Sequence, residues 1–104
     1  MDQFDDIWDE LIASLEPGIE INHWNPYNGY IGERITIVTS NQESISIEPP
    51  RVWGSQVISK RDFKNVWEVW EDYTALRLER RKIHGLTMHA KYIISILHWY
   101  DQET

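Results

Sequence analysis

The sequence predicts an α+β domain: an N-terminal helix, an antiparallel β-meander of three to four strands, and a C-terminal segment of two to three helices packed on the sheet. Three observations support this. Apolar residues recur at helical spacing in residues 4–15, alternate with polar residues between 19 and 48, and return to helical spacing after residue 59. All 104 residues, 1–104, are expected to form a single domain, because this length suits one hydrophobic core.

The first segment is an amphipathic helix that ends before Pro17 and Gly18. Asp2, Asp5 and Asp6 lie in or near its first turn, where unpaired N–H groups favour carboxylates. We therefore interpret these acids as helix-end electrostatics. The apolar residues share one helical stripe: Phe4, Ile7, Trp8, Leu11, Ile12 and Leu15.

The middle segment is expected to be an antiparallel meander. Residues 19–21, 30–31, 34–39 and 44–48 are rich in β-branched side chains, and the polar link 40–43 suits a hairpin. Pro49 and Pro50 end the last clear strand. Residues 52–53 and 56–58 are expected to add another strand, interrupted at Gly54.

The last segment is expected to be helical. Ser59 and Asp62 resemble a capping box, and apolar residues from Phe63 to Tyr73 predict a helix of about four turns. A shorter helix over 78–84 should end at Gly85, and Thr87 should cap a third helix. Apolar residues cover most of this third helix, which predicts that it is central in the core. Eight side chains are expected to be buried together: Trp8, Leu11, Phe63, Trp67, Trp70, Ile93, Ile96 and Leu97.

Composition and charge restrict the class of protein. The chain is 41% hydrophobic with six tryptophans, which is too apolar for a disordered chain. Its net charge of −7 is unevenly spread, because residues 1–50 carry ten carboxylates and Arg34 as their single base. The acidic N-terminus, the lack of cysteine and the lack of a long apolar stretch predict a cytoplasmic protein without a membrane partner.

No pattern of residues predicts catalysis. The four histidines lack the HExxH spacing, the glycines are single, and the serines lack a nucleophile-elbow context. Adjacent carboxylates such as Glu71 and Asp72 point about 100° apart on a helix and do not share a site. We therefore expect a protein that is not an enzyme, with no catalytic residue, no metal and no cofactor.

An aromatic loop is the first candidate binding feature. Residues 23–30 place Trp24, Tyr27 and Tyr30 among turn-forming residues, as is typical of binding surfaces. The alternative is that these rings close the edge of the core. Contact through this loop predicts a protein–protein interaction module, most simply a homodimer, in which Trp24, Tyr27 or Tyr30 lies in or beside the interface.

A basic stripe is the second candidate. Arg77, Arg80, Arg81 and His84 occur at i, i+3, i+4 and i+7, just before the helix expected from Thr87. This layout resembles a helix-turn-helix, in which such residues contact phosphates. The alternative function is therefore nucleic-acid binding, against which the net negative charge argues.

The second half also resembles a known group of proteins. The likeness spans residues 58–97 and consists of hydrophobic and capping positions. It resembles the C-terminal part of small uncharacterised bacterial proteins and of domains borne on mobile elements, including integron gene cassettes. This resemblance implies a bacterial accessory protein and transfers no functional residue. The resemblance rests on Ile58 to Phe63, Trp67, Trp70, Tyr73 and Thr87 to Leu97.

Overall fold

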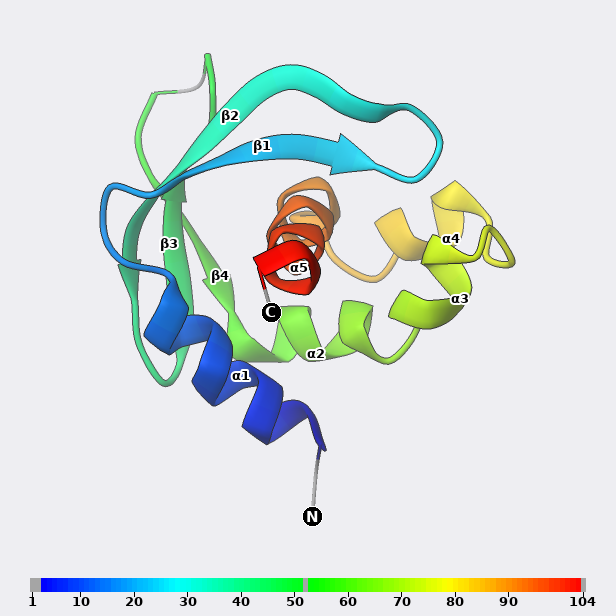
Figure 1. Cartoon of the computed structure of the whole chain (residues 1–104), viewed down its shortest axis with the longest axis horizontal. Coiled ribbons are helices and arrows are strands. Elements are labelled where there is room, and N and C mark those ends of the chain that lie inside the picture. Colours follow the sequence, from blue (N-terminus) through cyan, green and yellow to red (C-terminus); the bar gives the residue numbers. More distant parts are fainter. Residues whose placement is uncertain (1–2, 52, 104) are drawn as a thin grey trace.

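The computed structural model describes residues 3–51 and 53–103, and within them confirms the expected α+β class (Figure 1). No helix in this part of the chain is both long and apolar enough to cross a membrane. In chain order the elements are α1 (Gln3–Ser14), β1 (Glu20–Asn25), β2 (Gly29–Ser40), β3 (Ser44–Glu48), β4 (Gln56–Ser59), α2 (Lys60–Trp67), α3 (Trp70–Thr74), α4 (Arg80–His84) and α5 (Ala90–Glu103).

The four strands form an antiparallel meander in the order β1-β2-β3-β4. β2 is one continuous strand of 12 residues, so the two separate strands expected at 30–31 and 34–39 are corrected to one. The strand expected at 56–58 is confirmed as β4. Val52 lies outside the described residues, and Trp53 occupies a bend before β4.

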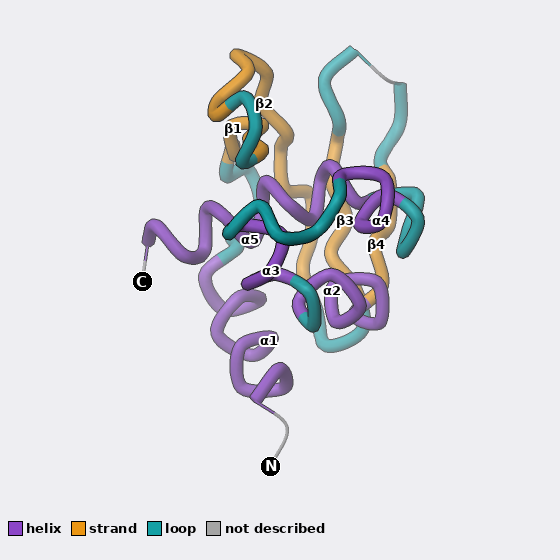
Figure 2. Tube along the Cα trace, turned by 90° about the vertical axis from the view of Figure 1, so that its right-hand side faces the viewer, coloured by secondary structure: helices purple, strands orange, loops and turns teal. Residues whose placement is uncertain are grey.

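The sheet curls around α5, which lies in its concave side (Figures 1 and 2). Two register shifts accompany this curvature. One lies between Asn22 and Trp24 of β1, opposite a longer stretch of β2, and the other lies between Ile37 and Thr39 of β2. Because a bulge bends a strand and increases its twist, these irregularities allow one sheet to face the helix from two sides. Gly32, with φ of +82°, occupies the first bulge.

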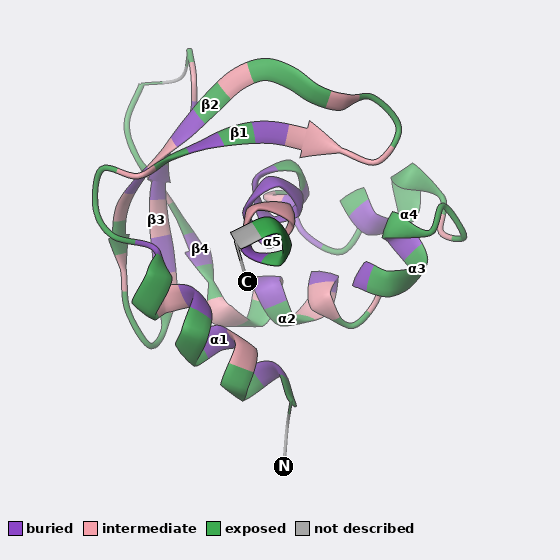
Figure 3. Ribbon diagram, viewed as in Figure 1, coloured by how far each residue is buried: buried purple, intermediate pink, exposed green. Residues whose placement is uncertain are grey.

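α5 is the central element of the core, as the sequence predicts. Every residue from Tyr92 to Leu97 is buried (Figure 3). β1 packs along this helix through Ser95, whose Oγ accepts a hydrogen bond from the backbone N–H of Trp24 at 3.0 Å. The Ser95 hydroxyl also lies 3.1 Å from the Lys91 carbonyl oxygen, to which it donates. The one buried polar side chain in the middle of α5 is therefore hydrogen-bonded.

Large aromatic side chains connect the other helices to this centre. Seven of the eight expected core residues are buried, whereas Trp67 is only partly buried. The Trp8 indole donates to the Gln42 carbonyl at 3.0 Å, and the Trp70 indole donates to the Asp101 carboxylate at 2.8 Å. Each ring thus buries an apolar body while its N–H keeps a partner.

The helices after β4 are shorter than the sequence predicts. Ser59 caps α2 as expected, since its Oγ accepts from the Asp62 N–H at 3.2 Å. The helix expected to continue to Tyr73 is instead broken after Trp67 into α2 and α3. Likewise α4 begins at Arg80 rather than at residue 78. α5 begins at Ala90, and the Thr87 hydroxyl accepts from the His89 N–H in the turn before it, so Thr87 caps this turn rather than the first turn of α5.

The end of α3 is strained at Leu76. Its φ of 60° lies in the left-handed region that favours glycine. The N–H of Leu76 bonds the Tyr73 carbonyl at 3.0 Å, and the N–H of Arg77 bonds the Asp72 carbonyl at 2.8 Å. This pair of bonds is a Schellman motif, whose left-handed position is occupied here by a side chain that is more than half exposed.

Replacing Leu76 by glycine is therefore expected to stabilise the fold. Relief of the strain stabilises the folded state by about 1–2 kcal/mol. This exceeds the stabilisation of the unfolded state by the greater conformational entropy of glycine, so the free energy of unfolding should rise by about 0.5–1 kcal/mol. Urea unfolding measures this change. Ala75→Gly is the matched control: its φ of −83° is ordinary, so this variant should lose stability. A loss in Leu76→Gly as large as in the control would contradict the assignment of strain.

Candidate functional site

The aromatic segment is a hairpin end rather than the loop expected at 23–30. His23, Trp24 and Asn25 belong to β1, and Tyr30 belongs to β2. The Asn25 side-chain oxygen accepts from the backbone N–H groups of Tyr27 and Asn28, at 2.9 and 2.8 Å. This Asx turn closes the hairpin and fixes the direction of the aromatic side chains beside it.

Trp24 and Tyr30 both contact His98 of α5. The Trp24 and His98 rings are stacked, with centroids 3.7 Å apart, and the Tyr30 hydroxyl lies 3.0 Å from His98 Nε2. His98 is thus a packing residue with a hydrogen-bond partner. Tyr30 remains 60% exposed, so it can contact a further molecule, whereas Trp24 is half-buried.

Tyr27 docks the tip of the hairpin on the segment between α3 and α4. Its hydroxyl donates to the Leu78 carbonyl at 3.1 Å, and its ring lies 6.1 Å from that of Tyr73. This contact joins the aromatic hairpin and the basic stripe, which are separate in the sequence. The aromatic hairpin and the basic stripe therefore lie on one surface.

The basic residues fall into two groups. Arg77 pairs with Asp72 and Arg81 pairs with Glu79, each at 2.9 Å. Arg80 makes no ion pair with any residue that the structure describes, and the same holds for Lys91 of α5. Arg80, His84 and Lys91 line a common cavity, so two cations without an ion pair meet there.

We call this cavity the basic pocket. It has a volume of about 100 Å³ and lies between the end of the β1–β2 hairpin, α4 and the first turns of α5. No carboxylate is among its lining residues, which are His23, Trp24, Asn25, Ile31, Arg80, His84, Lys91 and Ile94.

His23 contributes a buried polar atom to the basic pocket. The side chain is only 5% exposed, and its Nε2 has no hydrogen-bond partner among the described residues. Its ring packs edge-on against Tyr92 at 5.7 Å. Burial lowers the pKa of His23, an effect that Glu33 opposes and Lys91 reinforces. The imidazole is therefore neutral near pH 7.

His84 is the second histidine of the basic pocket. Its pKa is lowered by burial and then by the positive charges of Arg80 and Lys91. The neutral form of both histidines is thus favoured beside Arg80 and Lys91. Among the described residues, no three histidine or carboxylate side chains lie close enough to hold a metal ion.

The site unites residues that are far apart in sequence. Trp24, Arg80 and His84 line it as candidates from the sequence, whereas Tyr27, Tyr30, Arg77 and Arg81 do not. His23, Asn25, Ile31 and Lys91 complete it, and no sequence motif connects them. Lys91 follows Ile31 by 60 positions, so only the packing of α5 against the hairpin brings them together.

Comparisons of the chain with protein-family models, curated proteins and solved structures find no match. The resemblance of residues 58–97 to mobile-element and integron-cassette proteins thus stays a prediction.

Acidification is expected to destabilise the protein through its histidines. Burial lowers the native pKa of His23, His84 and His98 from the ordinary 6.5, so below about pH 6.5 the unfolded chain binds more protons than the native protein. The melting temperature should therefore fall between about pH 7.5 and 5.5. His23→Phe, which keeps an aromatic ring but cannot titrate, should reduce this fall. An equal fall in wild type and variant would show that His23 does not contribute.

Proposed function

We propose that this domain is a non-catalytic binding module that holds an acidic segment of a partner protein at the basic pocket. The observation that carries the proposal is the gathering of two unpaired cations, Arg80 and Lys91, around the buried His23 in a molecule of net charge −7. Because the rest of the chain is strongly acidic, such a local surplus of positive charge steers an anionic group to one place.

Apolar side chains beside the basic pocket support a protein partner. Tyr27, Tyr30 and Ile31 are each between 46% and 60% exposed at the hairpin end, and Ile31 lines the pocket itself. Aromatic side chains with a polar tip are enriched in protein interfaces because they bury much apolar area and keep a hydrogen bond. A segment with acidic and apolar residues would satisfy both parts of this surface.

The lining residues also support binding without catalysis. They supply cations, neutral imidazoles, one amide and apolar groups, but no carboxylate base and no hydroxyl or thiol nucleophile. Covalent catalysis through a hydroxyl or thiol therefore has no nucleophile among these residues. Recognition of an anion needs only donors and positive charge.

Nucleic-acid binding fits the same surface less well. Arg77 and Arg81 are each paired with a carboxylate, which leaves only Arg80 of the three arginines for a phosphate backbone. A recognition helix needs an exposed face, and α5 is buried over the whole run from Tyr92 to Leu97. Net repulsion between the acidic domain and a duplex adds to this difficulty.

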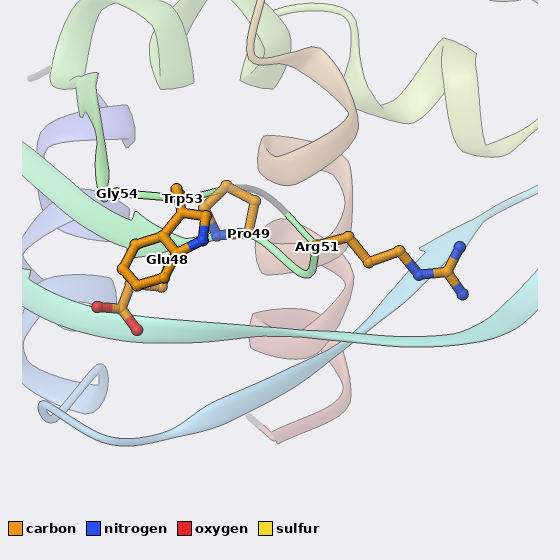
Figure 4. Close-up of a pocket in the computed structure, with 5 residues that line it drawn as sticks. All are labelled: Glu48, Pro49, Arg51, Trp53 and Gly54. Carbon is orange, nitrogen blue, oxygen red and sulfur yellow. The ribbon is translucent and has the colours of Figure 1, made fainter.

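Homodimer formation remains a second candidate, and the exposure of Trp53 favours it. This side chain is fully exposed in the loop before β4, beside a hollow of about 330 Å³ (Figure 4). Val57 follows four positions after Trp53 on the edge strand β4, and its side chain is 60% exposed. A two-fold contact between β4 edges would cover both side chains and leave the basic pockets of the two copies apart.

An acidic partner predicts the outcome of a peptide selection. Random displayed peptides selected on the folded protein at about 0.15 M salt should become enriched in sequences that combine Asp or Glu with aromatic residues. Arg80→Ala with Lys91→Ala should weaken binding of such a peptide about tenfold or more. The control Arg81→Ala with Lys82→Ala removes the same charge outside the basic pocket and should change affinity little. Enrichment of basic peptides, or equal losses in both variants, would contradict the proposal.

Dimer formation predicts that light scattering at micromolar concentration gives twice the chain mass, and that Trp53→Ser with Val57→Lys restores the monomer. A parallel gel shift with random duplex DNA at about 0.15 M salt should be negative. A monomer that shifts DNA, and loses the shift on Arg80→Ala with Arg81→Ala, would instead favour nucleic-acid binding. A dimer that the double variant leaves intact would show that β4 is not its interface.

A further inference from the structure

The basic pocket presents nitrogen donors from three separate elements. His23 and Asn25 lie on β1, Arg80 and His84 on α4, and Lys91 on α5. The Asn25 side-chain oxygen is already used by the hairpin turn, which leaves its amide N–H groups for another molecule. Donors that surround a small cavity from several sides suit a group whose acceptor oxygens point in several directions.

The charge of the basic pocket matches a dianion. Arg80 and Lys91 are permanently charged and form no ion pair with any described residue. A carboxylate would neutralise only one of these cations, whereas a phosphomonoester carries a charge of about −1.5 to −2 near pH 7. The negative charge of Glu33 acts on His23. Glu33 is paired with Arg51 at 3.4 Å, and this ion pair reduces the repulsion between Glu33 and an anion in the basic pocket.

The size of the basic pocket limits its occupant to one functional group. Its volume of about 100 Å³ lies well below the roughly 300–1,000 Å³ of pockets that enclose whole small molecules. The remainder of any ligand must therefore lie outside, across the exposed side chains of Tyr27, Tyr30 and Ile31.

His23 gives a separate indication that the basic pocket takes a ligand. A buried nitrogen without a hydrogen-bond partner destabilises the protein relative to a nitrogen that has one. Nε2 of His23 is such an atom, on a side chain that lines the basic pocket and is 5% exposed. In the tautomer that protonates Nε2, an oxyanion would supply the missing acceptor.

We propose that the basic pocket binds a single phosphomonoester group, carried by a side chain of the partner protein. This assignment rests on the proposed function and names the anionic group that the partner carries. The phosphate would lie between Arg80 and Lys91, with His23, His84 and the Asn25 amide as further donors. The aromatic hairpin end would contact the residues that flank the phosphorylated side chain.

Titration of the labelled, full-length protein with small anions tests this site. The histidine ring resonances are followed by NMR at pH 7.5 and constant ionic strength, with inorganic phosphate, O-phosphoserine and acetate as probes. Both phosphate compounds should shift the His23 and His84 signals saturably, whereas acetate at the same concentration should not. O-phosphoserine should bind at least as tightly as inorganic phosphate. A site for a phosphorylated side chain must accommodate the ester-linked carbon as well as the phosphate group.

Two double variants of equal charge provide the control. Arg80→Ala with Lys91→Ala should weaken phosphate binding about tenfold or more, because both charge-assisted contacts are lost. Arg81→Ala with Lys82→Ala should leave it within about twofold, because neither side chain lines the basic pocket. Comparing the two double variants separates binding in the basic pocket from general attraction to positive charge, because both remove the same charge.

Three results would overturn the assignment. Equal affinity for phosphate and acetate would remove the preference for a dianion. Equal losses in both double variants would show attraction without a site. Tighter binding of inorganic phosphate than of O-phosphoserine would identify free phosphate as the ligand instead of a phosphorylated side chain. Each of these is distinct from failure of the proposed function, because unphosphorylated acidic peptides could still bind through Arg80 and Lys91.

Discussion

The burial of α5 from Tyr92 to Leu97 is the constraint on which the rest of the structure depends. A helix that is apolar over most of its circumference must be covered from every side, and a flat sheet covers only one. The two register shifts let a single meander curl around the helix, while α2 closes another side (Figure 1). The aromatic residues of α1 and α3 then fill the remaining space, with their indole N–H groups hydrogen-bonded at the margins.

The same wrapping creates the basic pocket. The bulge at His23 and Gly32 lies where the β1–β2 hairpin extends along α5, and the chain then returns through α4 to the beginning of that helix. Tyr27 holds the hairpin end against the segment before α4. The basic pocket is the small space left where the hairpin, α4 and α5 meet, and side chains of these elements line it.

Two cations at that space have no ion-pair partner among the described residues. Asp72 and Glu79 neutralise Arg77 and Arg81, the neighbours of Arg80, whereas Arg80 and Lys91 have no such partner among the described residues. Burial lowers the pKa of His23 and His84, which favours their neutral forms and limits the repulsion between positive charges at that space. The basic pocket thus combines two cations with no lining carboxylate in a molecule of net charge −7.

Local sequence determined much of the fold, because helical and strand spacing report which face of an element meets the core. The stripe from Phe4 to Leu15, the Ser59 cap, the meander and the central place of α5 were all predictable in this way. The continuity of β2, the break after Trp67 and the hairpin form of residues 23–30 were not, because bulges and short turns depend on distant packing partners. For the site, turn-forming neighbours and helical spacing in the sequence predicted Trp24, Arg80 and His84 as candidate binding residues. Only the tertiary structure placed them with His23 and Lys91, because a pocket is formed by contacts between residues that no local pattern links.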